Sequence, residues 1–482
     1  MMNWLRKLAL AGAAFGISWG GAIWYWRETN RMPATSELAL YMLVLPLVLL
    51  TTLWLGRKAW ARISVPATAG ATAAATPAID AAPEAAPLPA ALIIAASAIR
   101  VPHGASVDEL RAALAGNQAR PNLDSELQDD DGYPVMSARL RDIDEDALRD
   151  DLEAWRGKLQ LANPRFDTAQ WRALDAATSA VSELAAQAAS HMYVAPWLQQ
   201  EHERQQGRLP PNAVPVPVPP SLQLLAVWPA DWTAQQREIA DQWLRTVAVQ
   251  AGWPQQRLAA PAPISDADDA GPALSKLLGH CGDSKHPCLA IVIAAASHLS
   301  ENSIASLSAQ NGLFSATHPQ GRIPGEGAAG LLLADAAHAS LITGRDDSGS
   351  VLQTIASGRR SASADDAKRD TDTSLAQAAE QALHNARLDG AAVTLVTADT
   401  GHRTSRVTEL MHVVTAAAPQ LDPGADVISI GSSCGSCGAV TWLTALAVAD
   451  AEVQDRGGPV LCISNEDPYR RYAALLRPAL AA

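Results

Sequence analysis

Two uncharged apolar segments, 8–26 and 38–55, open the chain, and each is long enough to cross a membrane as a helix. Basic residues flank the pair on its outer sides: Arg6, Lys7, Arg57, Lys58 and Arg62. Because basic flanks favour the cytoplasm, residues 1–62 are predicted to form a transmembrane hairpin anchor with both ends on that side. The alternative is one span with an interfacial helix, which would move the remaining chain to the periplasm.

The hydrophobic pattern changes twice after the anchor. Residues 63–90 are mainly Ala, Pro and Thr, with few large apolar side chains to bury, so they are predicted to be an extended linker. From residue 91 onward, continuous apolar runs of strand length alternate with segments of helical period. This alternation predicts an α/β fold with helices on both faces of its sheet.

The predicted strands lie at 91–99, 133–140, 221–229, 288–297, 328–335, 391–399, 426–432 and 458–465. The predicted helices lie at 144–158, 168–191, 233–252 and 439–453, and a further helix follows Ser106. Ser106 and Thr233 are candidate N-cap residues, because a side-chain oxygen there can accept a bond from a free N–H of the first turn. The proline-rich stretch 208–220 is either a domain seam or a surface loop.

Composition narrows the classes of function. The chain has 37 Lys and Arg against 50 Asp and Glu, a formal net charge of −13, which argues against nucleic acid as a partner. Five cysteines in 482 residues do not make a disulfide scaffold and favour a reducing compartment.

Three motifs in the second half of the chain carry a family resemblance. They are IPGEGAAGLLLAD at 323–335, GSCGAVTWLTALAVA at 435–449, and the spacing of Asp399, Gly401 and Glu409. Together they resemble the ketosynthases of the thiolase-like superfamily. The resemblance implies a thiolase-like layered fold over 91–482, clearer in 221–482 and weaker in 91–220. It marks a set of structural motif residues: Gly325, Glu326, Gly327, Asp399, Gly401, Gly435 and Gly438.

Ketosynthase chemistry needs a cysteine nucleophile and two polarising side chains, usually histidines. The resemblance places the nucleophile within 263–278, which contains no cysteine and has Ser265 as the nearest hydroxyl. It places Asp399 and Ser436 where the family has histidine, and His402 is out of register. The expectation is therefore a protein without enzymatic activity, cofactor or metal.

Glu326 and the cysteines each allow two interpretations. Glu326 is either a buried carboxylate that holds loops through N–H groups, the favoured interpretation, or a solvated turn residue. Cys434 and Cys437 form a CxxC before a helix, so a redox pair is the alternative to plain packing. A zinc site that adds Cys281 and Cys288 is disfavoured by their spacing.

A short double-span anchor, a linker and a degenerate thiolase-like domain resemble a family of bacterial inner-membrane proteins associated with type VI secretion lipase effectors. The resemblance implies a non-catalytic adaptor that binds a lipase-class effector at the cytoplasmic face of the inner membrane and delivers it to the secretion spike. The first alternative is an acyl-thioester enzyme with a rearranged active site. The second is a structural membrane protein whose soluble domain forms a homodimer.

Overall fold

The computed structural model describes residues 91–141, 143–261, 269–281, 287–344, 349–353, 355–366 and 372–479. Residues 86–482 form one compact unit, so the proline-rich stretch 208–220 is a surface loop and the domain-seam interpretation is wrong. The anchor predicted at 1–62 and the linker at 63–90 lie outside the described residues. Within the described part, no helix is both long and apolar enough to cross a membrane.

A ten-stranded mixed sheet organises the unit, in the order β10-β9-β11-β12-β7-β1-β6-β5-β4, with β8 paired to β12. The strands are β1 (Leu92–Arg100), β4 (Leu222–Val227), β5 (Leu289–Ser297), β6 (Glu326–Ala334), β7 (Ser350–Leu352), β8 (Ala356–Arg359), β9 (Leu395–Ala398), β10 (Val427–Ser429), β11 (Val460–Ser464) and β12 (Arg470–Pro478). A separate hairpin joins β2 (Asn122–Gln128) to β3 (Pro134–Ser137). Each predicted run contains a strand. However, the run 391–399 begins in the 3₁₀ helix η3 (Gly390–Ala392) and is a strand only in β9, and 430–434 forms the short helix α14 (Ile430–Cys434).

The sheet consists of two halves with the same pairing pattern. In the first half β4 pairs parallel with β5, then β5 with β6 and β6 with β1 pair antiparallel. In the second half β9 pairs parallel with β11, then β11 with β12 and β12 with β7 pair antiparallel. Strands β1 and β7 join the halves antiparallel. The fold is therefore an internal repeat, which no motif in the sequence reveals.

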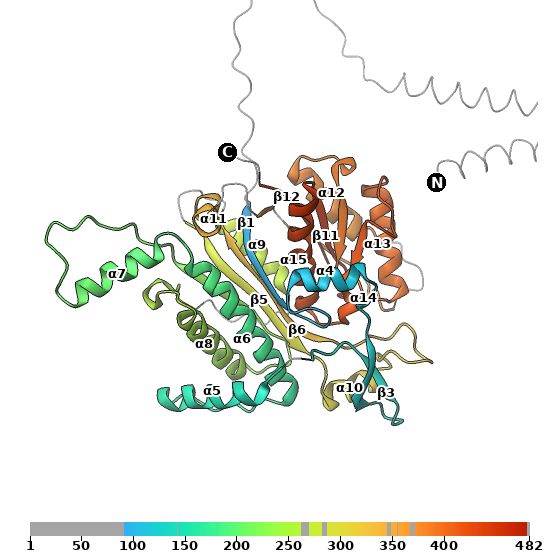
Figure 1. Ribbon diagram of the computed structural model, residues 1–482. Coiled ribbons are helices and arrows are strands. Elements are labelled where there is room, and N and C mark those ends of the chain that lie inside the picture. The colour runs from blue at the N-terminus through green and yellow to red at the C-terminus, as the bar shows by residue number, and fades with distance from the viewer. Residues whose placement is uncertain are drawn as a thin grey trace, which may run out of the picture. The chain divides into compact units, whose positions relative to one another are not determined.

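Helices cover both faces of each half (Figure 1). One core cluster packs α6 (Thr168–Ala189) and α8 (Ala234–Gln250) on the first half, and another packs α12 (Ser374–Ala386) and α13 (Thr404–Ala417) on the second. The central cluster combines α9 (Ala270–Cys281), α15 (Ala439–Arg456) and the inner faces of both halves. The layers therefore run helix, sheet, helix, sheet, helix. The remaining helices are α4 (Val107–Ala115), α5 (Glu145–Leu159), α7 (Val194–Gln205), α10 (Glu301–Ala309) and α11 (Ala336–Thr343).

Local sequence explains the main elements. Eight of the nine residues of β5 are buried because helices lie on both of its faces, so it shows no polar alternation. Ser106 caps α4 by accepting the N–H of Glu109, and Thr233 caps α8 by accepting the N–H of Gln236. Both predicted N-caps are thus confirmed.

Candidate functional site

The two glycine-rich turns of the family motifs contact each other through their backbones. The Gly325 N–H donates to the Ser436 carbonyl at 3.2 Å, and the Ser436 N–H donates to the Ile323 carbonyl at 2.7 Å. A Cβ on Gly325 would overlap the carbonyl oxygen of Cys434, and Gly435 has a φ of +71°. Only glycine fits these two positions, so the motif glycines let two distant segments lie in direct contact.

Glu326 is a buried carboxylate, with 1% of the residue exposed. It accepts the Leu140 N–H at 2.8 Å, the Ser297 hydroxyl at 2.9 Å and the Arg172 guanidinium at 2.5 and 2.9 Å. Its donors come from other segments rather than from the glycine turn itself. Glu326 therefore ties β5, α6 and the segment after β3 to the start of β6.

The remaining motif glycines differ in their roles. Gly327 has a φ of +153°, and a Cβ there would lie 2.6 Å from the Arg100 carbonyl oxygen. Gly438 has a φ of +55° and is the N-cap residue of α15. The Gly401 N–H donates to the Glu466 carboxylate at 2.9 Å.

The chain's own side chains occupy the amino-terminal end of α9, the helix on which the resemblance places the nucleophile. The Asp269 carboxylate accepts the Gly271 N–H at 2.9 Å and the Tyr472 hydroxyl at 2.5 Å. The Tyr472 ring lies against Gly271, where a Cβ would overlap it, and stacks on Trp442 with centroids 5.1 Å apart. Burial, followed by the nearby Asp269 charge, raises the pKa of Tyr472 well above its usual value. Ser265 lies outside the described residues.

This arrangement places a carboxylate at the amino-terminal end of α9. A helix amino terminus stabilises a thiolate because its free N–H groups and dipole favour negative charge. Here a fixed carboxylate takes that role, and it also lies 3.3 Å from the Arg470 guanidinium. A second anion beside Asp269 would be repelled.

Asp399 lies at the end of β9, where the family has histidine. It is buried and accepts the Ser464 hydroxyl at 2.5 Å, the Asn465 N–H at 2.8 Å and the Glu466 N–H at 3.2 Å. Burial raises its pKa to about 7. With three donors directed at it from the β11–β12 loop, Asp399 connects this loop to the end of β9.

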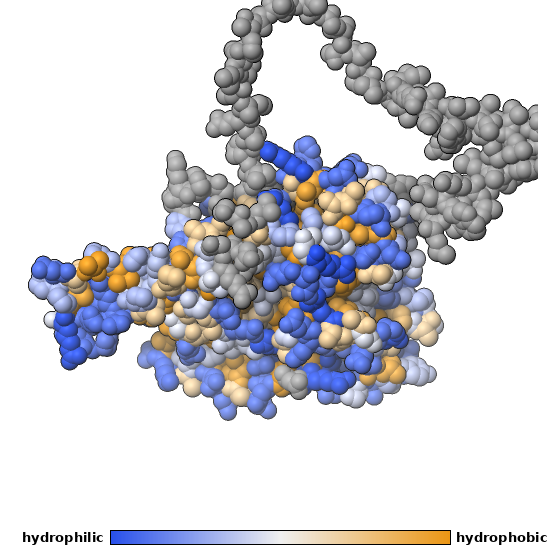
Figure 2. Space-filling model, turned by 45° about the horizontal axis from the view of Figure 1, so that its top comes forward, coloured by the Kyte–Doolittle hydropathy of each residue, from blue (hydrophilic) through white to orange (hydrophobic). Residues whose placement is uncertain are grey.

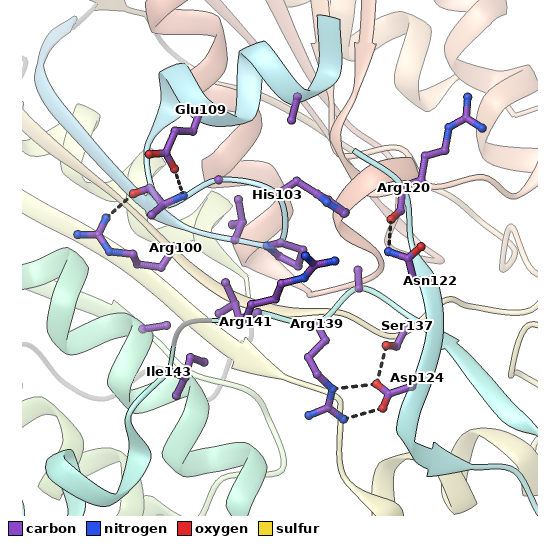
Figure 3. A pocket seen from close by; sticks show the side chains of 18 of the residues that line it. Arg100, His103, Glu109, Arg120, Asn122, Asp124, Ser137, Arg139, Arg141 and Ile143 are labelled. Carbon is purple, nitrogen blue, oxygen red and sulfur yellow. Dashed lines mark hydrogen bonds and ion pairs between the residues drawn. The ribbon is translucent and has the colours of Figure 1, made fainter. Parts of the chain in front are cut away.

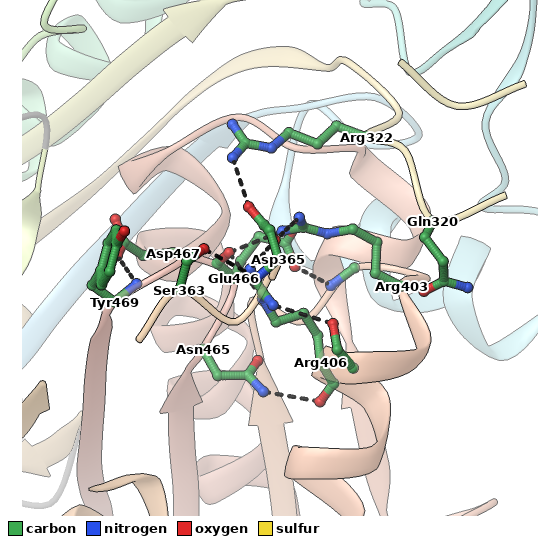
Figure 4. A network of polar contacts seen from close by, with 12 residues as sticks. Gln320, Arg322, Ser363, Asp365, Arg403, Arg406, Asn465, Glu466, Asp467 and Tyr469 are labelled. Carbon is green, nitrogen blue, oxygen red and sulfur yellow. Dashed lines mark hydrogen bonds and ion pairs between the residues drawn. The ribbon is translucent and has the colours of Figure 1, made fainter. Parts of the chain in front are cut away.

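An ionic network surrounds the loop after Asp399 (Figure 4). Arg403 contacts Asp365 at 2.5 Å and Glu466 at 2.8 Å, and Arg406 contacts Asp365 at 2.6 Å. The Arg403 and Arg406 charges offset the burial of Asp365, and the net effect lowers its pKa. His402 is half-buried with its ring edge-on to Phe314, and burial lowers its pKa.

Glu409, the last residue of the Asp399 motif, is also buried. It pairs with Arg360 at 3.1 Å and with Arg471 at 2.7 Å. These contacts tie α13 to the loop after β8 and to β12. The polar groups of the motif are thus engaged in structural contacts.

The thiols of the CxxC point to different acceptors. Cys434 lies 3.5 Å from the Pro102 carbonyl and Cys437 lies 3.3 Å from the Ala296 carbonyl. Burial raises the pKa of Cys434 to about 12 and raises that of Cys437 well above its usual value. Since thiol–disulfide exchange needs an accessible thiolate, this environment does not favour a redox pair.

The geometry does not favour the zinc alternative either. Cys288 is disulfide-bonded, whereas Cys434 and Cys437 are free and buried. Within the described ranges, no three His, Cys, Asp or Glu side chains lie close enough together to hold a metal ion.

A pocket of about 780 Å³ lies between α4, the β2–β3 hairpin and α6 (Figure 3). Two of its arginines are already paired, Arg100 with Glu183 at 2.8 Å and Arg139 with Asp124 at 2.9 Å. The sequence analysis did not identify this pocket, because its lining residues come from four segments without a shared motif.

The rest of the pocket lining is partly basic. His103 adopts a φ of +76°, and burial and the Arg141 charge lower its pKa. Arg120 and Arg141 are exposed, and their guanidinium groups make no hydrogen bond or ion pair with another described residue. Glu109 and Asp175 also line the pocket, so its unpaired charges nearly balance. The pocket is polar but carries no clear preference for anions.

Comparison with solved structures identifies the fold. The oxazolomycin ketosynthase domain of Streptomyces albus JA3453 is 12% identical, with a TM-score of 0.55 over 82% of this chain and 75% of its own. A β-ketoacyl synthase from Burkholderia phymatum STM815 is 14% identical, with a TM-score of 0.51 over 81% of this chain and 100% of its own. The ishigamide ketosynthase/chain length factor is 12% identical, with a TM-score of 0.50 over 81% and 99%.

Neither family models nor curated proteins match the chain by sequence. At identities this low, the structural likeness establishes the fold and nothing finer. The described unit has the thiolase-like fold of the ketosynthases, as the motifs predicted.

Proposed function

We propose that this protein is a non-catalytic adaptor that binds a secreted effector of the lipase class at the cytoplasmic face of the bacterial inner membrane and delivers it to the type VI secretion spike. The observation that carries the non-catalytic part is the occupied end of α9. Asp269 takes the helix N–H groups there and Tyr472 covers them. A ketosynthase-like fold without a nucleophile site can still bind another protein through its surface.

The choice of client and of membrane side depends on the sequence resemblance and on the predicted hairpin at 1–62. The anchor would hold the protein at the membrane, where secretion machines assemble. The linker 63–90 would let the folded unit reach a client. The net charge of −13 also favours basic protein surfaces over nucleic acid.

Affinity capture from the native cell tests the adaptor role. The tagged full chain is solubilised in detergent, washed at moderate salt, and the proteins that remain are quantified by mass spectrometry. A lipase-like effector or a spike protein in stoichiometric amount supports the proposal. Acyl carrier protein without an effector refutes it and favours the acyl-thioester enzyme.

A direct assay tests the catalytic alternative separately. The purified chain is incubated with a radiolabelled acyl thioester, and covalent acylation is followed by gel and by mass. We expect no acyl-protein, since the described end of α9 is filled. Stoichiometric acylation of any residue would overturn the non-catalytic assignment, whatever the capture experiment finds.

A further inference from the structure

An arm projects from the compact unit, made of α7 and the proline-rich segment 206–220 (Figure 1). Of the twelve residues of α7, only Val194 is buried. Figure 2 shows hydrophobic residues among hydrophilic ones along this arm. Neither the fold nor the ketosynthase motifs explain it.

The sequence fixes the backbone conformation of the proline-rich segment. Every residue from Val214 to Pro220, VPVPVPP, either is proline or directly precedes one. Proline fixes its own φ near −65°, and the residue before a proline is restricted to extended backbone. A run of such residues has only the left-handed polyproline II helix available, with three residues per turn.

Burial along the segment has this period of three. Ala213, Val216 and Pro219 are partly or fully buried, and the pairs between them, 214–215 and 217–218, are exposed. Hydrogen bonds hold the inner side in place. The Gln200 amide donates to the Val214 carbonyl at 2.9 Å and accepts the Val216 N–H at 3.2 Å.

The far end of the segment is also fixed, because the Arg257 guanidinium donates to the Pro219 carbonyl at 2.8 Å. The outer side is apolar: Val214 is 82% exposed and Val218 is 58% exposed, with Pro215 and Pro217 exposed between them. The segment therefore has a fixed backbone and an uncovered apolar side. Such a side is unfavourable in water unless something binds it.

The chemistry of this side selects the kind of partner. Proline has no N–H, and the Val216 N–H is already bonded to Gln200, so a β-strand would find only the Val214 and Val218 N–H groups to pair with. What it offers is carbonyl acceptors and flat apolar rings. Grooves lined by Trp and Tyr recognise this combination, because their rings pack on proline and their N–H and O–H groups donate to carbonyls.

We propose that the outer side of 214–218 docks into an aromatic-lined groove of a different protein. Among the large hydrophobic side chains exposed in the described part of the chain, only Tyr133 and Tyr469 are aromatic. They belong to distant elements, and the described cavity that contains Trp155 and Trp243 is lined mainly by polar and charged side chains, so the proposal commits to a different protein. The inference is independent of the proposed effector client, since any protein with this groove satisfies it.

Site-directed photo-crosslinking tests the proposal in the full-length chain. Benzoyl-phenylalanine replaces Val214, the native cell is irradiated, and the cross-linked residues are identified by mass spectrometry. The test variant combines Pro215→Gly and Pro217→Gly, which frees the backbone but keeps Val216 and Val218. The matched control combines Pro210→Gly and Pro211→Gly, which removes two prolines upstream in the same arm.

We expect a cross-link to another protein within a cluster of Trp or Tyr residues. Its yield should fall at least tenfold in the test variant and stay within twofold in the control. A cross-link to a second copy of this chain, to lipid or to a site without aromatic residues would overturn the proposal. So would no cross-link, or a yield unchanged by the test variant. Equal melting temperatures of both variants confirm that they fold.

Discussion

The Glu326→Gln substitution tests the contact that joins most segments around the family motif. The amide keeps the shape of the side chain but removes its charge and places an NH₂ group where Arg172 donates at 2.5 and 2.9 Å. The Arg172 side chain is only 13% exposed, so it would lose its ionic partner while largely out of water. Breaking a buried pair from one side costs about 3–5 kcal/mol, and the isosteric amide suggests the lower end, about 3 kcal/mol.

The assay is thermal unfolding of the full chain, followed by tryptophan fluorescence. With an unfolding entropy of about 2.1 cal/mol/K per residue, a unit of roughly 400 residues shifts its midpoint by about 1.2 °C per kcal/mol. We therefore expect Glu326→Gln to lower the midpoint by about 4 °C. The control Glu109→Gln changes an exposed carboxylate and should shift it by less than about 1 °C.

A double variant sharpens the same test. Adding Arg172→Met to Glu326→Gln removes the unpaired charge, so the combined loss should be smaller than the sum of the single losses by about 1 kcal/mol or more. Additive losses, or a Glu326→Gln shift no larger than that of the Glu109 control, would show that the buried pair does not hold the motif together.

Three further substitutions test other parts of the structure. Gly325→Ala should lower the free energy of unfolding by about 3 kcal/mol or more, because its Cβ would overlap the Cys434 carbonyl oxygen; soluble yield and thermal unfolding measure this. Burial, together with the adjacent His338, lowers the pKa of His191 to about 4, so the folded chain binds fewer protons than the unfolded one between about pH 6.5 and 4. The free energy of unfolding should fall by about 3 kcal/mol as the pH drops through this window. In the His191→Gln variant, this free energy should depend much less on pH. Burial raises the pKa of Asp399 to about 7, so between about pH 4 and 7 the folded chain binds more protons than the unfolded chain. The free energy of unfolding should therefore decrease as the pH rises through this window, which is a loss of stability. Asp399→Asn should remove this loss, and a variant as pH-dependent as the parent chain would contradict the assignment.

Much of the fold was predictable because continuous apolar runs and good N-caps are local signals. For example, the apolar runs in the sequence are enough to predict that β5, β6 and α15 are buried. The strand predicted over 426–432 was wrong in its second half, since Gly431 packs against the Asp399 carbonyl within α14. β12 was missed because it begins with Arg470 and Arg471, and a buried arginine cannot be recognised before its partner Glu409 is known.

The candidate site shows the same limit. The motifs indicated which glycines and carboxylates matter, and the structure adds that Gly325 and Gly435 lie close together, which the resemblance did not state. The covering of α9 could not be inferred, because Tyr472 lies 203 residues from Asp269 in sequence. The internal repeat was also hidden, since equal strand pairing does not require similar side chains.

The end of α9 and the arm are the two places where this chain's own side chains set what the fold can bind. A buried helix amino terminus must be satisfied by some anion or donor partner, and in this chain Asp269 satisfies it permanently. Its carboxylate and the Tyr472 hydroxyl that donates to it fill the described end of this helix. The segment 214–218 instead faces the solvent, and its backbone conformation is set before any partner binds. A fixed backbone lowers the entropy cost of docking, so a short segment can contribute appreciable affinity without any change in the thiolase-like core.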